Sequence, residues 1–337
     1  MMTQRIFLCL VVFSILVLGI LLMVFSRSPA AEQTGYLGLN DIKKGFGSGK
    51  CRSCHPAIWR EWERSMHAKA WSDPIYQEAA SVVVDRQKSC DPCHAPEPVL
   101  ITGIGKMPKL RDDDRQSGVS CLTCHVDMNG GMHGPSMNID AMFHANVTSE
   151  VHTKAIGLCA TCHGQPKVPE HNQIISFKKS QTSKEGGNCA TCHMPRVKRM
   201  QSTLSYERIS GRRHTWIASR SGQMLENAAE LMIEKRNGEA IIGVKNKSGH
   251  LLPGDGFRTI ILDVEISNPS GEIEYHQQIA HSMMLDSGQS DNRFQPDELR
   301  QFTFDLKPNY SIRARLLYCL LPTTPENEWV TMAEILK

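Results

Sequence analysis

The chain has 337 residues with 38 Lys and Arg, 35 Asp and Glu, and a formal net charge of +3. The length is enough for about two domains, and a charge this close to zero gives no argument for nucleic-acid binding. Twelve residues are cysteines, and ten of them fall between residues 51 and 193.

The chain opens with an apolar segment that covers residues 6–25 and is flanked by Arg5 and Arg27. Such a segment spans a bilayer core and exceeds the apolar core of about 7–15 residues in a secretion signal. The sequence therefore predicts an uncleaved signal-anchor within residues 1–30, a single-pass helix in the cell membrane with the short N-terminus in the cytoplasm. A cleaved secretion signal, with a weak site near residues 28–30, is the alternative.

Five copies of Cys-x-x-Cys-His follow, and this pattern is typical of covalent attachment of c-type haem. The cysteines are Cys51, Cys54, Cys90, Cys93, Cys121, Cys124, Cys159, Cys162, Cys189 and Cys192. The histidines are His55, His94, His125, His163 and His193. The thiols add across the haem vinyl groups and the histidine binds the iron, so the sequence predicts five covalently bound haem c groups. Because this attachment takes place outside the cytoplasm, we expect the body of the chain in the periplasm.

Other uses of cysteine explain the pattern less well. Zinc sites contain Cys-x-x-Cys pairs, but they do not need a histidine after each second cysteine. A disulfide framework would not repeat one five-residue unit five times. The two remaining cysteines are Cys9 in the apolar N-terminal segment and Cys319 in a predicted strand, and we interpret both as small apolar residues.

The motifs define a predicted haem domain over residues 41–220. Successive motifs begin 39, 31, 38 and 30 residues apart, which is too irregular for a solenoid. With so few residues for each haem, the porphyrins must form most of the core, and we expect short helices and long loops. The clearest helix is predicted from His55 to Ala70, and a second one over residues 71–88.

After residue 220 the pattern changes to strands. Asn237-Gly238 between two alternating segments is the strongest short-range hairpin signal. Further strand patterns follow at the spacing of a sandwich and predict a small antiparallel β-sandwich over residues 221–325. The predicted fold class is α+β, with a transmembrane helix, a mainly helical pentahaem domain and a C-terminal β-domain.

The two predicted domains differ in charge. Residues 41–220 carry 25 Lys and Arg against 17 Asp and Glu, whereas residues 221–337 carry 11 against 17. The basic excess suits the haem propionates, which bring the net charge of the loaded protein to about −2 when oxidised and about −7 when reduced. The sequence pI of about 8.2 therefore overstates the positive charge of the protein.

The histidines outside the motifs are candidates for the sixth position of each iron. We expect His67, His133, His152 and His214 as distal ligands. His144 is chosen for the fifth haem, with His171 and His250 as alternatives, and His276 and His281 are interpreted as ordinary strand residues. Methionine is the rival ligand and raises the reduction potential relative to histidine, but packing explains most of the 16 methionines.

The haem motifs and the segments that follow them resemble a family of multihaem c-type cytochromes, the cytochrome c-554-like proteins. This family is related to the tetrahaem electron acceptor of hydroxylamine oxidoreductase. The resemblance covers roughly residues 45–320 and includes the motifs, the segment RRHTW and the segment NKSGHLLPGDGFR. It implies stacked haem pairs and bis-histidine ligation at most irons, with His67, His133, His152 and His214 as distal ligands. This chain differs from the tetrahaem member by a fifth haem, the anchor and the β-domain. The resemblance therefore does not predict the same redox partner.

The function predicted from these features is electron transfer in the periplasm, without catalytic residues, between redox partner proteins or from a membrane donor such as quinol. A membrane-anchored quinol dehydrogenase is one alternative. That family has a Met shortly after its first motif, whereas the first motif here continues as Pro56-Ala57-Ile58. A multihaem nitrite- or hydroxylamine-converting oxidoreductase is another, and it would need one iron with an open sixth position. The β-domain is expected to cap the haems, with partner binding or oligomerisation as the alternative.

Overall fold

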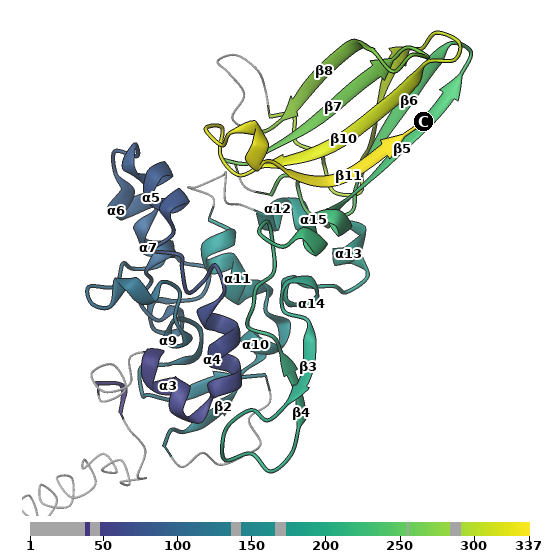
Figure 1. Ribbon diagram of the computed structural model, residues 1–337. Coiled ribbons are helices and arrows are strands. Elements are labelled where there is room, and N and C mark those ends of the chain that lie inside the picture. The colour runs from purple at the N-terminus through teal and green to yellow at the C-terminus, as the bar shows by residue number, and fades with distance from the viewer. Residues whose placement is uncertain (1–37, 41–47, 136–142, 166–172, 255, 284–290) are drawn as a thin grey trace, which may run out of the picture.

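The computed structural model of the chain describes residues 38–40, 48–135, 143–165, 173–254, 256–283 and 291–337. The predicted membrane helix within residues 1–30 lies outside these ranges. Among the described residues, no helix is both long and apolar enough to cross a membrane. The structure mixes helices and strands, as the α+β prediction requires, with the helices gathered at one end and the large sheets at the other (Figure 1).

The part that contains the motifs is built from short helices. Their bounds are α3 (Ser48–Cys54), α4 (Pro56–Glu63), α5 (Pro74–Ser81), α6 (Arg86–Ser89), α7 (Asp91–His94), α8 (Val99–Thr102), α9 (Cys121–His125), α10 (Glu150–Lys154), α11 (Ile156–His163), α12 (Gln173–Phe177), α13 (Gln181–Lys184) and α14 (Cys189–His193). A 3-10 turn covers Arg115–Ser117. None of these helices is longer than eight residues, so the expectation of short helices joined by loops is confirmed for the described part of the chain.

The two helices predicted after the first motif are shorter than expected. Pro56 starts α4 in its first turn, where proline needs no hydrogen-bond partner, but the α-helix ends at Glu63 and turns continue to residue 72. The predicted helix over residues 71–88 is divided into α5 and α6 by an apolar link in which Val82 and Val84 are exposed. Periodicity therefore located both helices but overestimated their length.

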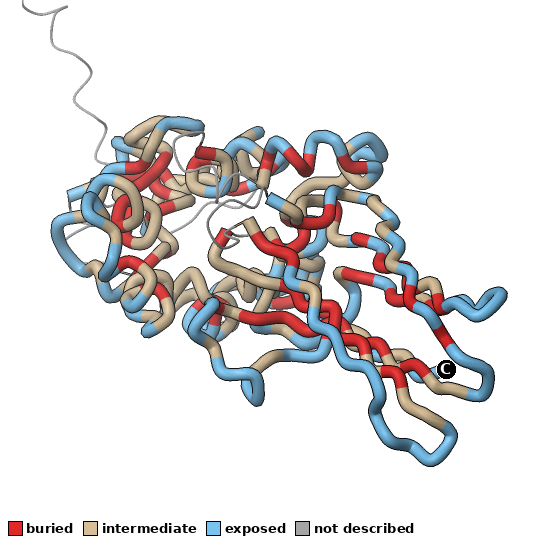
Figure 2. Tube along the Cα trace, turned by 90° about the horizontal axis from the view of Figure 1, so that it is seen from above, coloured by how far each residue is buried: buried red, intermediate tan, exposed pale blue. Residues whose placement is uncertain are grey.

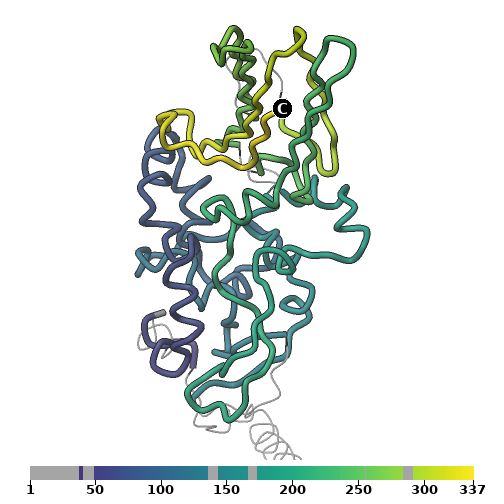
Figure 3. Tube along the Cα trace, turned by 45° about the vertical axis from the view of Figure 1, so that its right-hand side comes forward, coloured from purple at the N-terminus to yellow at the C-terminus, as the bar shows by residue number. Residues whose placement is uncertain are grey.

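Two small pairs of strands connect these helices. A parallel pair joins β1 (Met132–Gly134) and β2 (Asn146–Thr148), and an antiparallel hairpin joins β3 (Arg196–Arg199) and β4 (Ile209–Arg212). The hairpin leads away from α14 and returns towards α15 (Gly222–Ala228), as Figure 3 shows. At its tip, the Thr203 amide donates to the Cys54 carbonyl over 2.7 Å, which connects the hairpin to the first motif.

The β-domain consists of two antiparallel sheets. The strands are β5 (Ala229–Arg236), β6 (Glu239–Asn246), β7 (Thr259–Ser267), β8 (Ile273–His281), β9 (Leu299–Asp305), β10 (Ser311–Cys319) and β11 (Val330–Leu336). One sheet has the order β5-β6-β9 and the other β11-β10-β7-β8. The predicted Asn237-Gly238 hairpin is confirmed, because both residues have positive φ and join β5 to β6. β11 lies beyond the predicted end of the domain at residue 325.

Alternating side chains from both sheets form the core of the β-domain. Ile242, Leu262, Ile312 and Leu316 are fully buried, and they belong to one continuous apolar cluster. The buried segments follow the strands (Figure 2). Cys319 lies in β10 and is buried, as predicted. The division at residue 220 into two folding domains remains a prediction.

Loops of the β-domain contact the helical part through hydrogen bonds. The Leu251 amide donates to Ser176 Oγ over 3.2 Å, and Gln173 Nε2 donates to the Gly254 carbonyl over 2.6 Å. A third bond joins the Gln181 amide to Asp297 Oδ2 over 2.7 Å. These contacts hold the loop that contains His250 against α12.

Candidate haem centres

The five motifs share one local structure. In four motifs a short helix contains both cysteines, and in motif two Cys90 directly precedes the helix. The cysteines are three residues apart, as neighbours on one helix face are, and the histidine comes at or directly after the end of the helix. In α9 and α14 the threonine between the cysteines completes a capping box, with Ser120 and Asn188 as the partners. Local capping therefore fixes the start of the helix at these two motifs.

The imidazoles of four motif histidines are oriented by backbone carbonyls. Nδ1 lies 2.8 Å from Gln201 O for His55, 2.7 Å from Ala70 O for His94, 2.6 Å from His133 O for His125 and 2.7 Å from Ile217 O for His193. Because a carbonyl can only accept, Nδ1 carries the proton and Nε2 keeps its lone pair for a metal. This is the arrangement that an iron ligand requires.

Four motif histidines each face a histidine from outside the motifs. The distances between ring centres are 6.3 Å for His55 and His144, 6.4 Å for His163 and His67, 6.1 Å for His125 and His214, and 6.4 Å for His193 and His250. Two imidazoles on opposite sides of one metal ion have ring centres about 6 Å apart, because each metal–nitrogen bond is about 2 Å and each nitrogen lies about 1 Å from its ring centre. All four spacings fit an iron between the rings.

The remaining predicted ligands are placed differently. His133 and His152 also lie 6.4 Å apart, but neither belongs to a motif, and their Nε2 atoms contact Asp127 Oδ2 at 2.8 Å and Cys124 O at 3.0 Å. The His152 ring also lies 5.0 Å from the ring of the motif histidine His125, which is shorter than the spacing expected for two ligands of one metal ion. The roles of His133 and His152 as distal ligands stay predictions. His171 lies outside the described residues.

Burial keeps the facing histidines neutral. Mainly through burial, and further through neighbouring imidazoles, the pKa of His67 and that of His214 are lowered to about 3. Burial also lowers the pKa of His144 and of His250. Neutral imidazole is the form that binds a metal, so no proton has to leave these four residues at neutral pH.

Thiols of different motifs lie beside one another. The thiol of Cys51 interacts with that of Cys121, which lowers the pKa of Cys51 and raises that of Cys121. In the same way, Cys159 interacts with Cys189 and lowers the pKa of Cys189 to about 7. A third contact joins motifs two and four, where Cys93 raises the pKa of the Cys162 thiol. Cys124 of motif three lies close enough to Cys159 and Cys162 to raise the pKa of both further. The five motifs therefore form one connected cluster.

The second motif has surroundings that sequence reasoning missed. The Tyr76 ring is stacked on the His94 ring, with ring centres 3.5 Å apart and planes 9° apart. Tyr76 Oη donates to Asp91 Oδ1 over 2.5 Å, and Arg86 donates to the same oxygen over 3.0 and 3.1 Å. Tyr76 fell in a predicted helix, but nothing in the sequence pattern connects it to the motif. The contact fixes the side of the imidazole that faces the protein.

The residues present fit covalently bound haem. Each motif supplies two thiols for the vinyl groups and an imidazole for the iron, and four motifs have a neutral second imidazole at the spacing of a six-coordinate metal. The Nδ1 atom of His67 is buried without a hydrogen-bond partner, as is common where the natural neighbour is a bound group rather than the protein. We conclude that the cluster is a haem-binding region.

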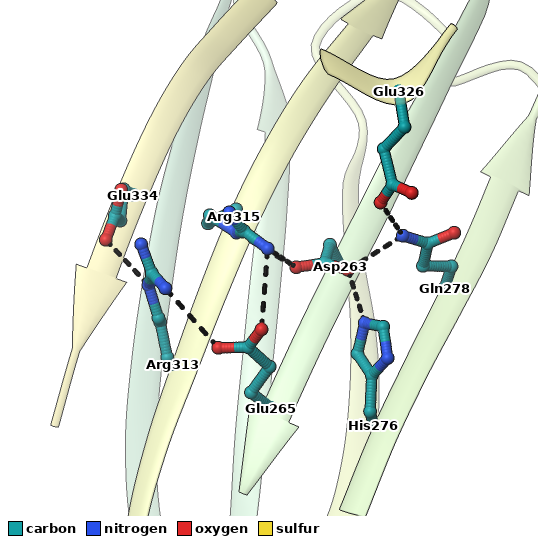
Figure 4. Close-up of polar contacts among 8 residues, drawn as sticks. All are labelled: Asp263, Glu265, His276, Gln278, Arg313, Arg315, Glu326 and Glu334. Carbon is teal, nitrogen blue, oxygen red and sulfur yellow. Dashed lines mark hydrogen bonds and ion pairs between the residues drawn. The ribbon is translucent and has the colours of Figure 1, made fainter. Parts of the chain in front are cut away.

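A second cluster of titratable groups lies on the outer face of the four-stranded sheet (Figure 4). Asp263, Glu265 and His276 have oxygen and nitrogen atoms close enough to surround a metal ion. However, Asp263 Oδ2 already accepts two hydrogen bonds from Arg315, over 2.9 and 2.7 Å, and Glu265 lies 3.4 Å from Arg313. These carboxylates are neutralised by guanidinium groups, so we interpret the cluster as an ion-pair network that joins β7, β8 and β10.

Comparison with known proteins agrees with this conclusion. Residues 50–126, which include the first three motifs, match the family model described as cytochrome c554 and c-prime. The first three motifs are therefore similar to those of the cytochrome c554 family, and this similarity supports a multihaem c-type cytochrome. No curated protein gives a significant match to the chain.

Solved structures give the same fold. A penta-haem cytochrome c552 from Thermochromatium tepidum is similar over 86% of this chain and 98% of its own, with a TM-score of 0.63 and 20% identity. Two further matches cover only a third of this chain. They are the C-terminal domain of Wzt (TM-score 0.19, 12% identity, 32% of this chain and 68% of that one) and the putative ApaA protein from Bordetella pertussis (0.19, 14%, 33% and 94%). Scores that low carry no argument, whereas the first match supports the arrangement of haem region and β-domain as a whole.

Proposed function

We propose that the protein is a pentahaem c-type cytochrome that transfers electrons in the periplasm between a membrane or periplasmic donor and a redox acceptor. The observation that carries this proposal is the pairing of four motif histidines with four distant histidines at ring-centre distances of 6.1–6.4 Å. An iron with two imidazole ligands has no position left for a substrate. It exchanges electrons rather than ligands.

The ligand pairs follow from the same geometry. In the proposed assignment, haem one is held by His55 and His144, haem three by His125 and His214, haem four by His163 and His67, and haem five by His193 and His250. The haems supply the redox chemistry when bound. The chain orients the imidazoles, keeps them neutral and excludes water. The count of five haems rests on five complete motifs and on the penta-haem structural neighbour.

The contacts between thiols support a path for electrons. They favour an order in which haem one lies next to haem three, haem three next to haem four, and haem four next to both haem two and haem five. Haem four would then be a branch point, and haems one, two and five would be the ends where partners exchange electrons. Short edge-to-edge distances along this path are what a multihaem carrier needs.

The experiment is a haem count combined with a ligand test on the purified full-length protein. We expect five c-type haems per chain in the reduced pyridine spectrum, and at least four that do not bind carbon monoxide in the ferrous state. A count below four would contradict the pentahaem proposal. Carbon monoxide binding at several haems would favour the alternative of a nitrite- or hydroxylamine-converting enzyme, which needs an open iron.

The membrane anchor and the redox partners are part of the proposal. The apolar segment 6–25 supports the anchor, and a quinol or a soluble redox protein is the expected donor. Fractionation of cells that produce the full chain tests the first point. Haem absorbance in the membrane fraction after a high-salt wash is the expected result, and recovery in the soluble periplasmic fraction would contradict it.

A further inference from the structure

The ion pair between Glu61 and Arg199 contacts the backbone at His214 and Arg212. Arg199 is 7% exposed, and its Nη1 atom donates to both Glu61 carboxylate oxygens over 2.9 and 3.0 Å. Glu61 comes from α4 and Arg199 from β3, so the pair joins the first helix after motif one to the hairpin that leads to His214. One nitrogen of Arg199 thus contacts both oxygens of the carboxylate, and hydrogen bonds between charged groups are stronger than neutral ones.

Both members of the pair hold the backbone around His214. Glu61 Oε2 accepts the amide hydrogen of His214 over 2.9 Å, and Arg199 Nη2 donates to the Arg212 carbonyl over 3.0 Å. That same carbonyl lies 3.0 Å from His214 Nδ1 and accepts its hydrogen. Glu61 therefore fixes the main chain of His214, and Arg199 fixes the carbonyl that orients its ring.

We propose that Glu61 and Arg199 are positioning residues for the third haem, holding His214 opposite His125 and setting the potential of the iron between them. This inference rests on the proposed ligation of haem three by His125 and His214. Neither residue was singled out by the sequence, since each belongs to a run of charged side chains that resembles a solvated surface.

The charges of the pair give opposite predictions for its two members. An oxidised haem carries one positive charge more than a reduced haem, so an unbalanced positive neighbour favours reduction and an unbalanced negative neighbour favours oxidation. Glu61→Gln leaves Arg199 unbalanced and is expected to raise one midpoint potential. Arg199→Gln leaves Glu61 unbalanced and is expected to lower the potential of the same haem.

The hydrogen bonds give a second readout. Loss of groups that orient a metal ligand typically weakens ligation about 10–100-fold. Both variants are therefore expected to speed the replacement of His214 by carbon monoxide at one ferrous haem, by a factor of about 10 or more. Arg199→Lys keeps the charge but loses the second nitrogen, which donates to the Arg212 carbonyl, so it should speed this replacement while leaving the potential closer to that of the parent protein.

The test uses the full-length haem-loaded protein, with spectropotentiometric titration and stopped-flow mixing with carbon monoxide. The matched controls are Glu63→Gln, on the same helix, and Lys198→Gln, next to Arg199, because both side chains are exposed. We expect the controls to behave like the parent. Potentials that shift in the same direction in Glu61→Gln and Arg199→Gln, or variants that match their controls, would overturn the proposal.

His214→Gly separates this inference from the ligation on which it rests. If His214 binds the third iron, this variant gains one rapidly reacting carbon monoxide site, and adding Glu61→Gln changes the reaction no further. If His214→Gly gains no such site, the assigned ligation is wrong. If it gains the site while Glu61→Gln and Arg199→Gln behave like the parent, only the positioning role is wrong.

Discussion

At the scale of single residues, the motif histidines depend on backbone carbonyls far along the chain. Gln201 and Ile217 accept hydrogens from His55 and His193, so the orientation of an iron ligand is set by a segment that the motif itself does not contain. A carbonyl cannot be removed by changing a side chain. The orientation of these proximal ligands should therefore tolerate a change of side chain at the residue that accepts the hydrogen bond.

Tyr76 gives a prediction at this scale. Tyr76→Phe keeps the ring on His94 but removes the hydroxyl that donates to Asp91, so a buried carboxylate loses one donor. We expect the free energy of unfolding to fall by about 1.5–3 kcal/mol, since the lost bond is to a charged group. Denaturant unfolding followed by haem absorbance measures this. The control is Tyr206→Phe, because Tyr206 is 99% exposed, and an equal loss there would contradict the assignment.

At the scale of elements, the turn before α9 supports His67. Gly118 has φ of +54°, and a Cβ placed there would lie 2.5 Å from the His67 carbonyl oxygen. The neighbouring Val119 amide donates to that same oxygen over 2.8 Å. The close approach explains why glycine is needed at this position, which the sequence alone does not reveal.

Gly118→Ala is therefore expected to disturb the fourth haem. The added methyl group pushes on the His67 backbone and should give one haem a high-spin fraction and carbon monoxide binding in the ferrous state. Magnetic resonance and difference spectra measure both. Gly105→Ala separates the clash from backbone strain, because Gly105 also has positive φ but nothing lies within 4 Å of a Cβ there. A similar high-spin fraction in both variants would contradict the explanation by a steric clash with His67.

The ion-pair network of the four-stranded sheet gives a pH prediction. Burial alone would raise the pKa of Asp263, but hydrogen bonds from His276, Arg315 and Gln278 outweigh burial and lower it. A carboxyl with a lowered folded-state pKa stabilises the fold above its unfolded pKa of about 3.9, and this contribution disappears as the pH falls through the folded value. Asp263 and its partners should therefore stabilise the β-domain at neutral pH and not in strong acid.

Asp263→Asn tests this expectation. The variant leaves Arg315 with only the longer contact to Glu265, at 3.5 Å, and we expect a loss of about 3 kcal/mol at pH 7, because Asp263 is buried. The difference from the parent should shrink below about pH 4. Thermal unfolding across pH measures it, with exposed Asp305→Asn as the control. A constant difference at all pH values would contradict the role of the ionised carboxylate.

At the scale of the whole molecule, the proposed ligation gives the β-domain a role beyond covering the haems, because His250 belongs to it. His250 lies in a loop held by Asn246, whose Nδ2 donates to His250 O, Phe294 O and Gln295 O over 2.7–3.1 Å. Asn246 is fully buried. The domain thus holds the loop of His250, whose ring lies 6.4 Å from that of His193, whereas the sequence left His250 as one of two alternatives to His144.

His250→Gly should separate the two parts of the protein functionally. We expect one haem to become high-spin and to bind carbon monoxide, while the other haems and the β-domain keep their spectra and stability. Magnetic resonance and carbon monoxide titration measure this change. His276→Gly, in the same domain, is the control and should leave every haem unchanged. If His250→Gly matches it, the β-domain only covers the haems.

Sequence and structure agree where the signal is local. The motifs identify the cofactor, and alternation with the Asn237-Gly238 turn identifies the hairpin, because each depends on residues close in the chain. The facing histidines could not be assigned in the same way. His55 faces His144 and His193 faces His250 across long stretches of sequence, and the spacing between them contains no information about which loops meet.

The contacts between thiols of different motifs have a consequence for how the protein is made. Cys51 lies beside Cys121, Cys159 beside Cys189 and Cys93 beside Cys162. In an oxidising compartment, a chain that folded before receiving its cofactors would bring these free thiols together, and they would crosslink the wrong motifs. If the chain is exported as proposed, haem attachment has to precede folding. The same closeness that connects the finished redox chain makes the order of its biogenesis strict.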